Sequence, residues 1–167
     1  MSAVQQYQRM LNARRIAICL LLAGTLAACV DQDAPRASMT LNLVGYNHMA
    51  DGIANFDVQI KGGSKTGGGF LDAGSGGGGM ICCISVPEKW QPGLAAQVNA
   101  EAYSNSGEKY QIAKQMFIPQ YAPDQAGHVS VHFLRNGEIK IFVTRYALWH
   151  PDYPLKGELA KLKISER

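Results

Sequence analysis

The sequence predicts an all-β fold, a single antiparallel β-sandwich of about seven strands whose arrangement could be immunoglobulin-like. Three observations favour this fold. Short segments alternate apolar and polar residues, turn residues separate most of these segments, and no long segment keeps a helical period. The expected strands are residues 39–46, 53–60, 81–86, 94–103, 109–118, 128–134 and 138–144.

Side-chain patterns justify the first five of these strands. Four of them place apolar residues mainly at every second position, which leaves one face of the strand apolar. The third, residues 81–86, is a short apolar run that ends at Pro87, because proline cannot donate a ladder hydrogen bond. The alternating apolar residues include Met39, Leu41, Leu43, Phe56, Val58, Ile60, Val98, Ala100, Tyr110 and Ile112.

The last two expected strands form the clearest pair. Val129, Val131 and Phe133 face one way along the first of them, and the second repeats this alternation. Asn136-Gly137 lies between the two strands and is a strong hairpin signal, because a type I′ turn needs a positive φ at both central residues. We therefore expect a type I′ hairpin here.

The N-terminal residues predict a bacterial lipoprotein signal. Three arginines precede an apolar run that is too short to span a membrane, and Leu26-Ala27-Ala28-Cys29 matches the lipobox. In an ordinary secretory signal that is cleaved elsewhere, Cys29 would remain a plain thiol. We expect the lipoprotein: residues 1–28 are removed, Cys29 is lipidated, residues 29–38 form a tether, and residues 39–167 form the β-sandwich domain.

The anchor is expected at the outer membrane, facing the periplasm. Two or three acyl chains hold a protein stably, since each buried methylene contributes about 0.8 kcal/mol. An aspartate directly after the lipidated cysteine is typical of retention at the inner membrane, and this chain has Val30 there.

Charge argues against a nucleic-acid partner. The whole chain has a net charge of +3, with 16 basic and 13 acidic residues. Three basic residues lie in the signal, so the mature chain keeps 16 − 3 = 13 basic residues and is neutral overall. A basic surface for nucleic acid is therefore not expected.

A glycine-rich stretch, Gly62 to Gly79, holds ten glycines in 18 residues. It lacks the strand–loop–helix frame of a phosphate-binding loop, so nucleotide binding is not expected. Two interpretations stay open, a mobile surface loop and a closely packed one in which missing Cβ atoms let backbones approach. Because such a loop could also order against a partner, Gly76, Gly77 and Gly78 are candidate partner contacts.

Two adjacent cysteines, Cys82 and Cys83, follow this stretch. They could be small buried apolar residues, a strained vicinal disulfide, or a pair that binds a soft metal or another chain. We expect His128 and His132, on the polar face of their strand, to be solvated and not metal ligands. No catalytic motif or cofactor signature is visible, so we expect neither an enzyme nor a cofactor.

The segment "WHPDYP", residues 149–154, combines two aromatic residues with a histidine and two prolines. It could be a rigid turn that caps the core, a binding loop, or both. As a binding loop it would contribute Trp149, His150, Asp152 and Tyr153.

Four pieces of the chain carry a resemblance to a known family. They are residues 41–48, the glycine run with 82–93, residues 127–141, and residues 149–154. Together they resemble an uncharacterised domain family of small proteobacterial lipoproteins, often encoded near type VI secretion phospholipase effectors. The resemblance implies an immunity protein that binds an effector lipase, and it implies no particular contact residues.

Two other classes of function are compatible with the sequence. One is a structural or assembly lipoprotein of the envelope or secretion machine. The other is a soft-metal or redox carrier that uses Cys82 and Cys83.

Overall fold

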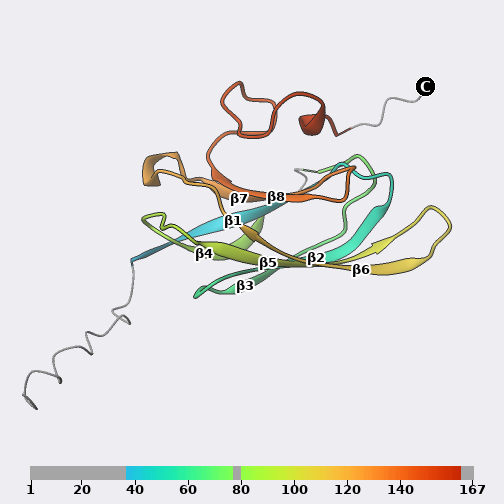
Figure 1. The fold of residues 1–167 in the computed structure, drawn as a ribbon, viewed down its shortest axis with the longest axis horizontal. Coiled ribbons are helices and arrows are strands. Elements are labelled where there is room, and N and C mark those ends of the chain that lie inside the picture. The colour runs from blue at the N-terminus through green and yellow to red at the C-terminus, as the bar shows by residue number, and fades with distance from the viewer. Residues whose placement is uncertain (1–36, 77–79, 163–167) are drawn as a thin grey trace, which may run out of the picture. The chain divides into compact units, whose positions relative to one another are not determined.

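The computed structural model describes residues 37–76 and 80–162. These residues form two four-stranded sheets packed face to face, as Figure 1 shows, so the predicted all-β sandwich is confirmed. Sheet A has the order β4-β1-β7-β8 and sheet B the order β3-β2-β5-β6. The strands are β1 Ser38–Asn47, β2 Gly52–Ile60, β3 Lys65–Gly68, β4 Ile81–Pro87, β5 Ala95–Tyr103, β6 Lys109–Phe117, β7 His128–Phe133 and β8 Ile139–Thr144, and two 3-10 helices are η2 Pro123–Gln125 and η3 Gly157–Ala160.

Strand pairing within the sheets is antiparallel with one exception. β1 and β7 run parallel, with Asn42 opposite His128 and Asn47 opposite Phe133. The chain therefore places its first strand in the middle of sheet A, between β4 and the β7–β8 hairpin. As a result, the end of β1 and the end of β7 lie at the same end of the sandwich.

The hydrophobic core lies between the two sheets. It includes most of the side chains expected to face inward from the period-two pattern, and these are almost fully buried. The expected inward face of residues 109–118 is an exception, since Tyr110 is 37% exposed and Ile112 and Met116 are only partly buried. Full burial of one such side chain contributes about 1.5–3 kcal/mol, so this layer supplies most of the driving force for folding. The buried residues include Leu43, Phe56, Val58, Ile60, Val98, Ala100, Val129, Val131, Phe133, Ile139, Ile141 and Val143.

The outer face of sheet A is covered by the C-terminal segment, residues 145–162, which lies against β7 and β8 on the side away from sheet B (Figure 1). A second apolar cluster forms there from Leu134, Tyr153 and Leu155, with Phe142 and Tyr146 packed against it. Ser130 and His132 point to this face and are fully buried. The prediction that His128 and His132 are solvated is therefore wrong for His132, because the cover removes its strand face from water. It is also wrong in part for His128, which is half-buried with its Nε2 atom closed to solvent.

The glycine-rich stretch contains a strand that the side-chain pattern does not indicate. β3 pairs antiparallel with β2, and Gly68 lies opposite Phe56. A Cβ on Gly68 would sit 2.0 Å from the Cζ atom of Phe56, so the glycine leaves room for that buried ring. The interpretation of the stretch as a mobile loop is therefore wrong for β3, because this part is paired to a sheet.

The β7–β8 hairpin forms where Asn136-Gly137 predicts it, but with a different turn. Gly137 has a φ of 77°, whereas Asn136 keeps a negative φ, so the expected type I′ turn is wrong. The Gly137 N–H donates to the Leu134 carbonyl at 2.9 Å, and the Leu134 N–H donates to the Glu138 carbonyl at 2.8 Å. This pattern is that of a three-residue loop whose last residue is left-handed, the other common hairpin that needs glycine.

The predicted signal peptide, the lipidation site Cys29, and the glycines Gly77 and Gly78 lie outside the described residues. Among the residues described, none belongs to a helix with the length and apolarity needed to cross a bilayer.

Candidate functional site

The predicted binding loop, residues 149–154, presents its side chains to two different environments. Trp149 is 87% exposed, and His150 and Asp152 also lie on the surface. Tyr153 is 0% exposed, so its place among the predicted partner contacts needs correction: its ring is packed inside the molecule. The segment is therefore both a cap on the core and a platform that displays a tryptophan.

Local contacts hold this platform in one shape. The backbone N–H of His150 donates to the Ala147 carbonyl at 2.8 Å, and that of Tyr153 donates to the His150 carbonyl at 3.0 Å. The His150 ring stacks on Tyr146 with 4.4 Å between ring centroids, and its Nδ1 accepts the Asp152 N–H at 3.1 Å. Trp149 therefore stands on a loop that is ordered by its own hydrogen bonds.

Beneath the platform, a chain of hydrogen-bonded, buried polar side chains lies between the outer face of sheet A and the C-terminal cover. His48 Nδ1 lies 3.0 Å from the Lys161 carbonyl oxygen, and His48 Nε2 lies 2.9 Å from His132 Nδ1. His132 Nε2 lies 2.5 Å from the Tyr153 hydroxyl, which bonds the Ser130 hydroxyl at 2.8 Å. The chain thus links the end of β1, the middle of β7 and the C-terminal cover.

Its protons can be placed from the groups at its two ends. The Lys161 carbonyl only accepts, so His48 carries hydrogen on Nδ1, and a neutral His48 then accepts from His132 Nδ1–H. A neutral His132 in turn accepts from the Tyr153 hydroxyl at Nε2. The Tyr153 hydroxyl then accepts from Ser130, which gives up its long 3.5 Å contact to the Phe142 carbonyl. If the two imidazoles carry one extra proton, His132 Nε2–H donates to the Tyr153 hydroxyl. Tyr153 then donates to Ser130, and Ser130 donates to the Phe142 carbonyl.

Burial keeps this chain neutral. It lowers the pKa of His48, where a neighbouring Arg135 adds to the effect and the bond to the Lys161 carbonyl opposes it. It lowers the pKa of His132 further, helped by His48 and His128. It raises the pKa of Tyr153. These groups are buried and bonded to one another, so they hold the C-terminal cover on sheet A.

The aromatic ring of Tyr46 extends the buried chain sideways. It stacks on His132 with 4.6 Å between centroids and 5° between planes. Gly76 packs directly on Tyr46, since a Cβ on Gly76 would lie 2.6 Å from the Tyr46 Cα atom. The closely packed interpretation therefore holds for this end of the glycine-rich stretch, and Gly76 is half-buried against the core rather than displayed to a partner.

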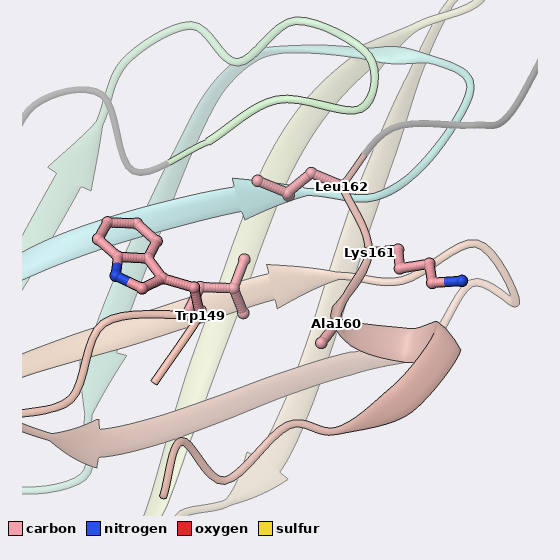
Figure 2. A pocket seen from close by; sticks show the side chains of 5 residues that line it. Trp149, Ala160, Lys161 and Leu162 are labelled. Carbon is pink, nitrogen blue, oxygen red and sulfur yellow. The ribbon is translucent and has the colours of Figure 1, made fainter. Parts of the chain in front are cut away.

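An open apolar pocket of about 490 Å³ adjoins Trp149. Figure 2 shows Trp149 on one side, with Leu162, Lys161 and Ala160 on the other; Leu148 completes the lining. The wall at Lys161 is fixed, because its carbonyl oxygen also accepts from Arg135 Nη2 at 2.5 Å. The buried histidine chain and the pocket therefore share one residue, Lys161.

The cysteine pair forms a β-bulge in the edge strand β4. Leu41 pairs with Ile84 and Leu43 with Ile81, so Cys82 and Cys83 together lie opposite the single residue between those leucines. Both cysteines are exposed, which makes the buried interpretation wrong. The structure joins their sulfur atoms in a disulfide, and the peptide bond between the two cysteines is cis. Within the described part of the chain, no group of three or more histidine, cysteine or acidic residues is placed to hold a metal ion.

Sequence reasoning missed most of the buried chain. His48 shows no motif, and Ser130 and His132 look like the polar half of an alternating strand. One signal could have found them: the apolar residues after β8, such as Leu148 and Leu155, need a surface to cover.

Comparison with known proteins gives one match. The DUF3304 family, described as proteins of unknown function, matches residues 46–141, which is 141 − 46 + 1 = 96 of 167 residues. The chain belongs to the DUF3304 family. The DUF3304 match includes His48, His132 and the cysteine pair, while Tyr153 and Trp149 lie beyond it. No curated protein and no solved structure matches this DUF3304 chain.

Proposed function

We propose that this protein is an immunity lipoprotein that binds and neutralises a type VI secretion phospholipase effector in the periplasm. The observation that carries the proposal is Trp149, a large apolar side chain left 87% exposed on an ordered loop. Tryptophan is among the residues that most often dominate binding energy at protein interfaces. Single apolar side chains are common on protein surfaces, but Trp149 also borders an apolar pocket, which a partner could fill.

The support beneath Trp149 lowers the cost of binding. A loop that is already ordered loses little conformational entropy when a partner docks, so more of the contact energy appears as affinity. Here the loop is fixed by its turns and by Tyr153 in the buried chain. The apolar pocket beside Trp149 offers a place for an apolar side chain of the effector.

The proposed anchor places the protein where the effector acts. A phospholipase delivered to the periplasm attacks the membrane, and acyl chains on Cys29 would hold the inhibitor at the outer membrane. Confinement to the same surface raises the effective concentration of the inhibitor for its target.

The test compares Trp149→Ala with Leu159→Ala. Both remove an exposed large apolar side chain from the C-terminal cover, but Leu159 does not line the pocket. We expect Trp149→Ala to weaken effector binding roughly 30-fold or more, as loss of a central tryptophan typically does. We expect Leu159→Ala to bind like the wild type.

Two readouts are needed: inhibition of the purified phospholipase by titrated protein, and survival of cells that produce the effector in the periplasm. Unchanged thermal melts show that both variants fold. Full inhibition by Trp149→Ala would remove this surface from the interface. If the wild type inhibits no phospholipase effector and instead binds envelope components, the assembly function replaces the immunity function.

A further inference from the structure

One long strand of sheet B has an edge without a partner, and we propose that it pairs with the same edge of a second copy of this chain. The strand is β6, and the pairing is antiparallel, so the two copies of sheet B join into one continuous sheet. This inference does not depend on the immunity function, because it rests on different residues and concerns a different contact.

The outer edge of β6 carries unpaired backbone groups. In an antiparallel ladder, pairs that exchange hydrogen bonds alternate with pairs that do not. At the two ends of β6, the Ser104 N–H donates to the Glu108 carbonyl and the Ile118 N–H donates to the Leu94 carbonyl, both at 2.9 Å. The register between these ends is unbroken, so even-numbered residues bond to β5 and odd-numbered residues direct their N–H and C=O groups away from it. No other backbone group of the described residues bonds to these outward-facing residues, which are Lys109, Gln111, Ala113, Gln115 and Phe117.

The other sheet edges are shorter or interrupted. β3 has only four residues, and its Thr66 hydroxyl donates to the Cys83 carbonyl of β4 at 2.6 Å. β4 is broken by the bulge at the cysteine pair, and β8 has six residues. β6 has nine residues, no proline and no register shift against β5. Because short strands and bulges are the usual protection of an edge, β6 is the edge best able to pair.

The outward-facing residues of β6 fit antiparallel pairing of the strand with itself. A two-fold axis through Ala113 pairs the whole strand and places Gln111 opposite Gln115 of the second copy. It also places Lys109 opposite Phe117, whose side chain is 75% exposed in the single chain. The apolar stem of the lysine and its cationic head can both lie against the phenylalanine ring.

The remaining residues of β6 also avoid a clash of charges in this register. Ile112 lies opposite Lys114 of the second copy, and Tyr110 lies opposite Met116. Lys114 does not block the contact, because its Nζ donates to the Gly137 carbonyl of its own chain at 2.5 Å. A shift of the axis by one residue would place the two Lys114 side chains directly opposite each other, which is unfavourable. Self-pairing through Ala113 is therefore the register that the strand favours.

Cysteine substitution on the axis tests the contact and its register together. In a hydrogen-bonded antiparallel pair the two Cα atoms are about 5.5 Å apart, a distance that a disulfide can join. Ala113→Cys should therefore form a disulfide-linked dimer on mild oxidation of the purified full chain, seen by non-reducing electrophoresis and lost on reduction. Gln111→Cys is the matched control, because the two copies of residue 111 are separated by roughly 14 Å along the strands. The wild type, with its own cysteines, gives the background.

Sedimentation velocity between about 1 and 200 µM protein measures the association itself. We expect the wild type to pass from monomer to dimer as its concentration rises. Ala113→Lys brings two ammonium groups together on the axis and should raise the dissociation constant roughly fivefold. Gln59→Lys adds the same charge to the same face of sheet B, but it lies on the inner strand β2 and should dimerise like the wild type. Residues 59, 111 and 113 are exposed, so all variants should keep the wild-type thermal melt.

Three results would overturn the proposal. The first is a wild type that stays monomeric over the whole range of concentration. The second is equal cross-linking of Gln111→Cys and Ala113→Cys, because chance collisions would then explain both. The third is an equal loss of dimer in Gln59→Lys, which would mean that net charge and not the edge of β6 controls association.

Discussion

At the scale of single residues, the Tyr153 hydroxyl is held by two buried partners. It lies between His132 Nε2 and Ser130 Oγ at hydrogen-bond distance from both, and all three residues are fully buried. A buried polar group is costly only when its partner is missing, so the stability of this cluster depends on each member being present.

Tyr153→Phe tests this dependence. The change keeps the ring and removes one oxygen, which leaves His132 Nε2 without its partner and leaves Ser130 Oγ with only its long contact to the Phe142 carbonyl. We expect the free energy of unfolding to fall by about 1–3 kcal/mol, the usual cost of an unsatisfied buried polar group, as measured by urea denaturation.

Tyr146→Phe provides the comparison in the same segment. No hydrogen bond to the Tyr146 hydroxyl is recorded among the described residues, although its ring stacks on His150. Its unfolding free energy should therefore stay close to the wild type. Equal losses in the two variants would mean that the ring environment, and not the hydrogen-bonded chain, explains the effect.

At the scale of elements, the glycine-rich stretch is a packed element with a strand in it. Gly68 makes room for Phe56, and Gly76 lies on the backbone of Tyr46. Gly69, between them, has nothing within 4 Å of an added Cβ. The run of glycines therefore mixes positions where a side chain is forbidden with positions where it is free.

Gly76→Ala should destabilise the protein, because the new methyl group would meet the Tyr46 Cα atom at 2.6 Å and the Gly45 carbonyl oxygen at 2.8 Å. Backbone atoms cannot move aside as a side chain can. We expect a loss of about 1–3 kcal/mol in unfolding free energy, typical of overpacking. Gly69→Ala should change it by no more than about 0.5 kcal/mol. If Gly76→Ala melts at the wild-type temperature, this end of the stretch is not packed as described.

The elements also show what the sequence can and cannot predict. Six strands follow from period two, because burial of one face leaves that pattern directly, and β4 follows from its short apolar run before Pro87. β3 was missed because its residues, Lys65–Gly68, have no apolar alternation and are placed by the partner strand. His132 was predicted to be solvated because alternation shows only that the two faces of a strand differ in polarity. The C-terminal segment that covers its polar face comes from residues after β8, which alternation within the strand does not indicate. Tyr153 was misjudged for the same reason.

At the scale of the whole molecule, burial of histidines makes stability depend on pH. Desolvation lowers the pKa of His48, His128 and His132 in the folded protein. In the unfolded chain each would take up a proton near pH 6.5, the usual value for histidine. The unfolded state therefore binds more protons than the folded state once the pH falls below that value.

The expected result is full stability above about pH 6.5 and a loss as the pH falls, by up to about 1.4 kcal/mol per pH unit for each histidine that stays neutral in the fold. Urea denaturation at several values between about pH 7.5 and pH 5 measures it, and this window lies above the range where carboxylates titrate. His150→Asn, a change on the surface, should keep the wild-type slope. A flat profile would contradict the neutral chain.

The parallel pairing of β1 with β7 has a consequence for the order in which the protein can fold. Asn42 and His128 are 128 − 42 = 86 residues apart, yet they are neighbours in sheet A. A chain that emerges from its N-terminus first exposes β1 long before β7 exists to cover one of its edges. Contacts between such distant segments form slowly. Sheet A is completed only when β7 and β8 are present, so the edge of β1 that β7 covers stays unpaired until nearly the whole domain has been synthesised.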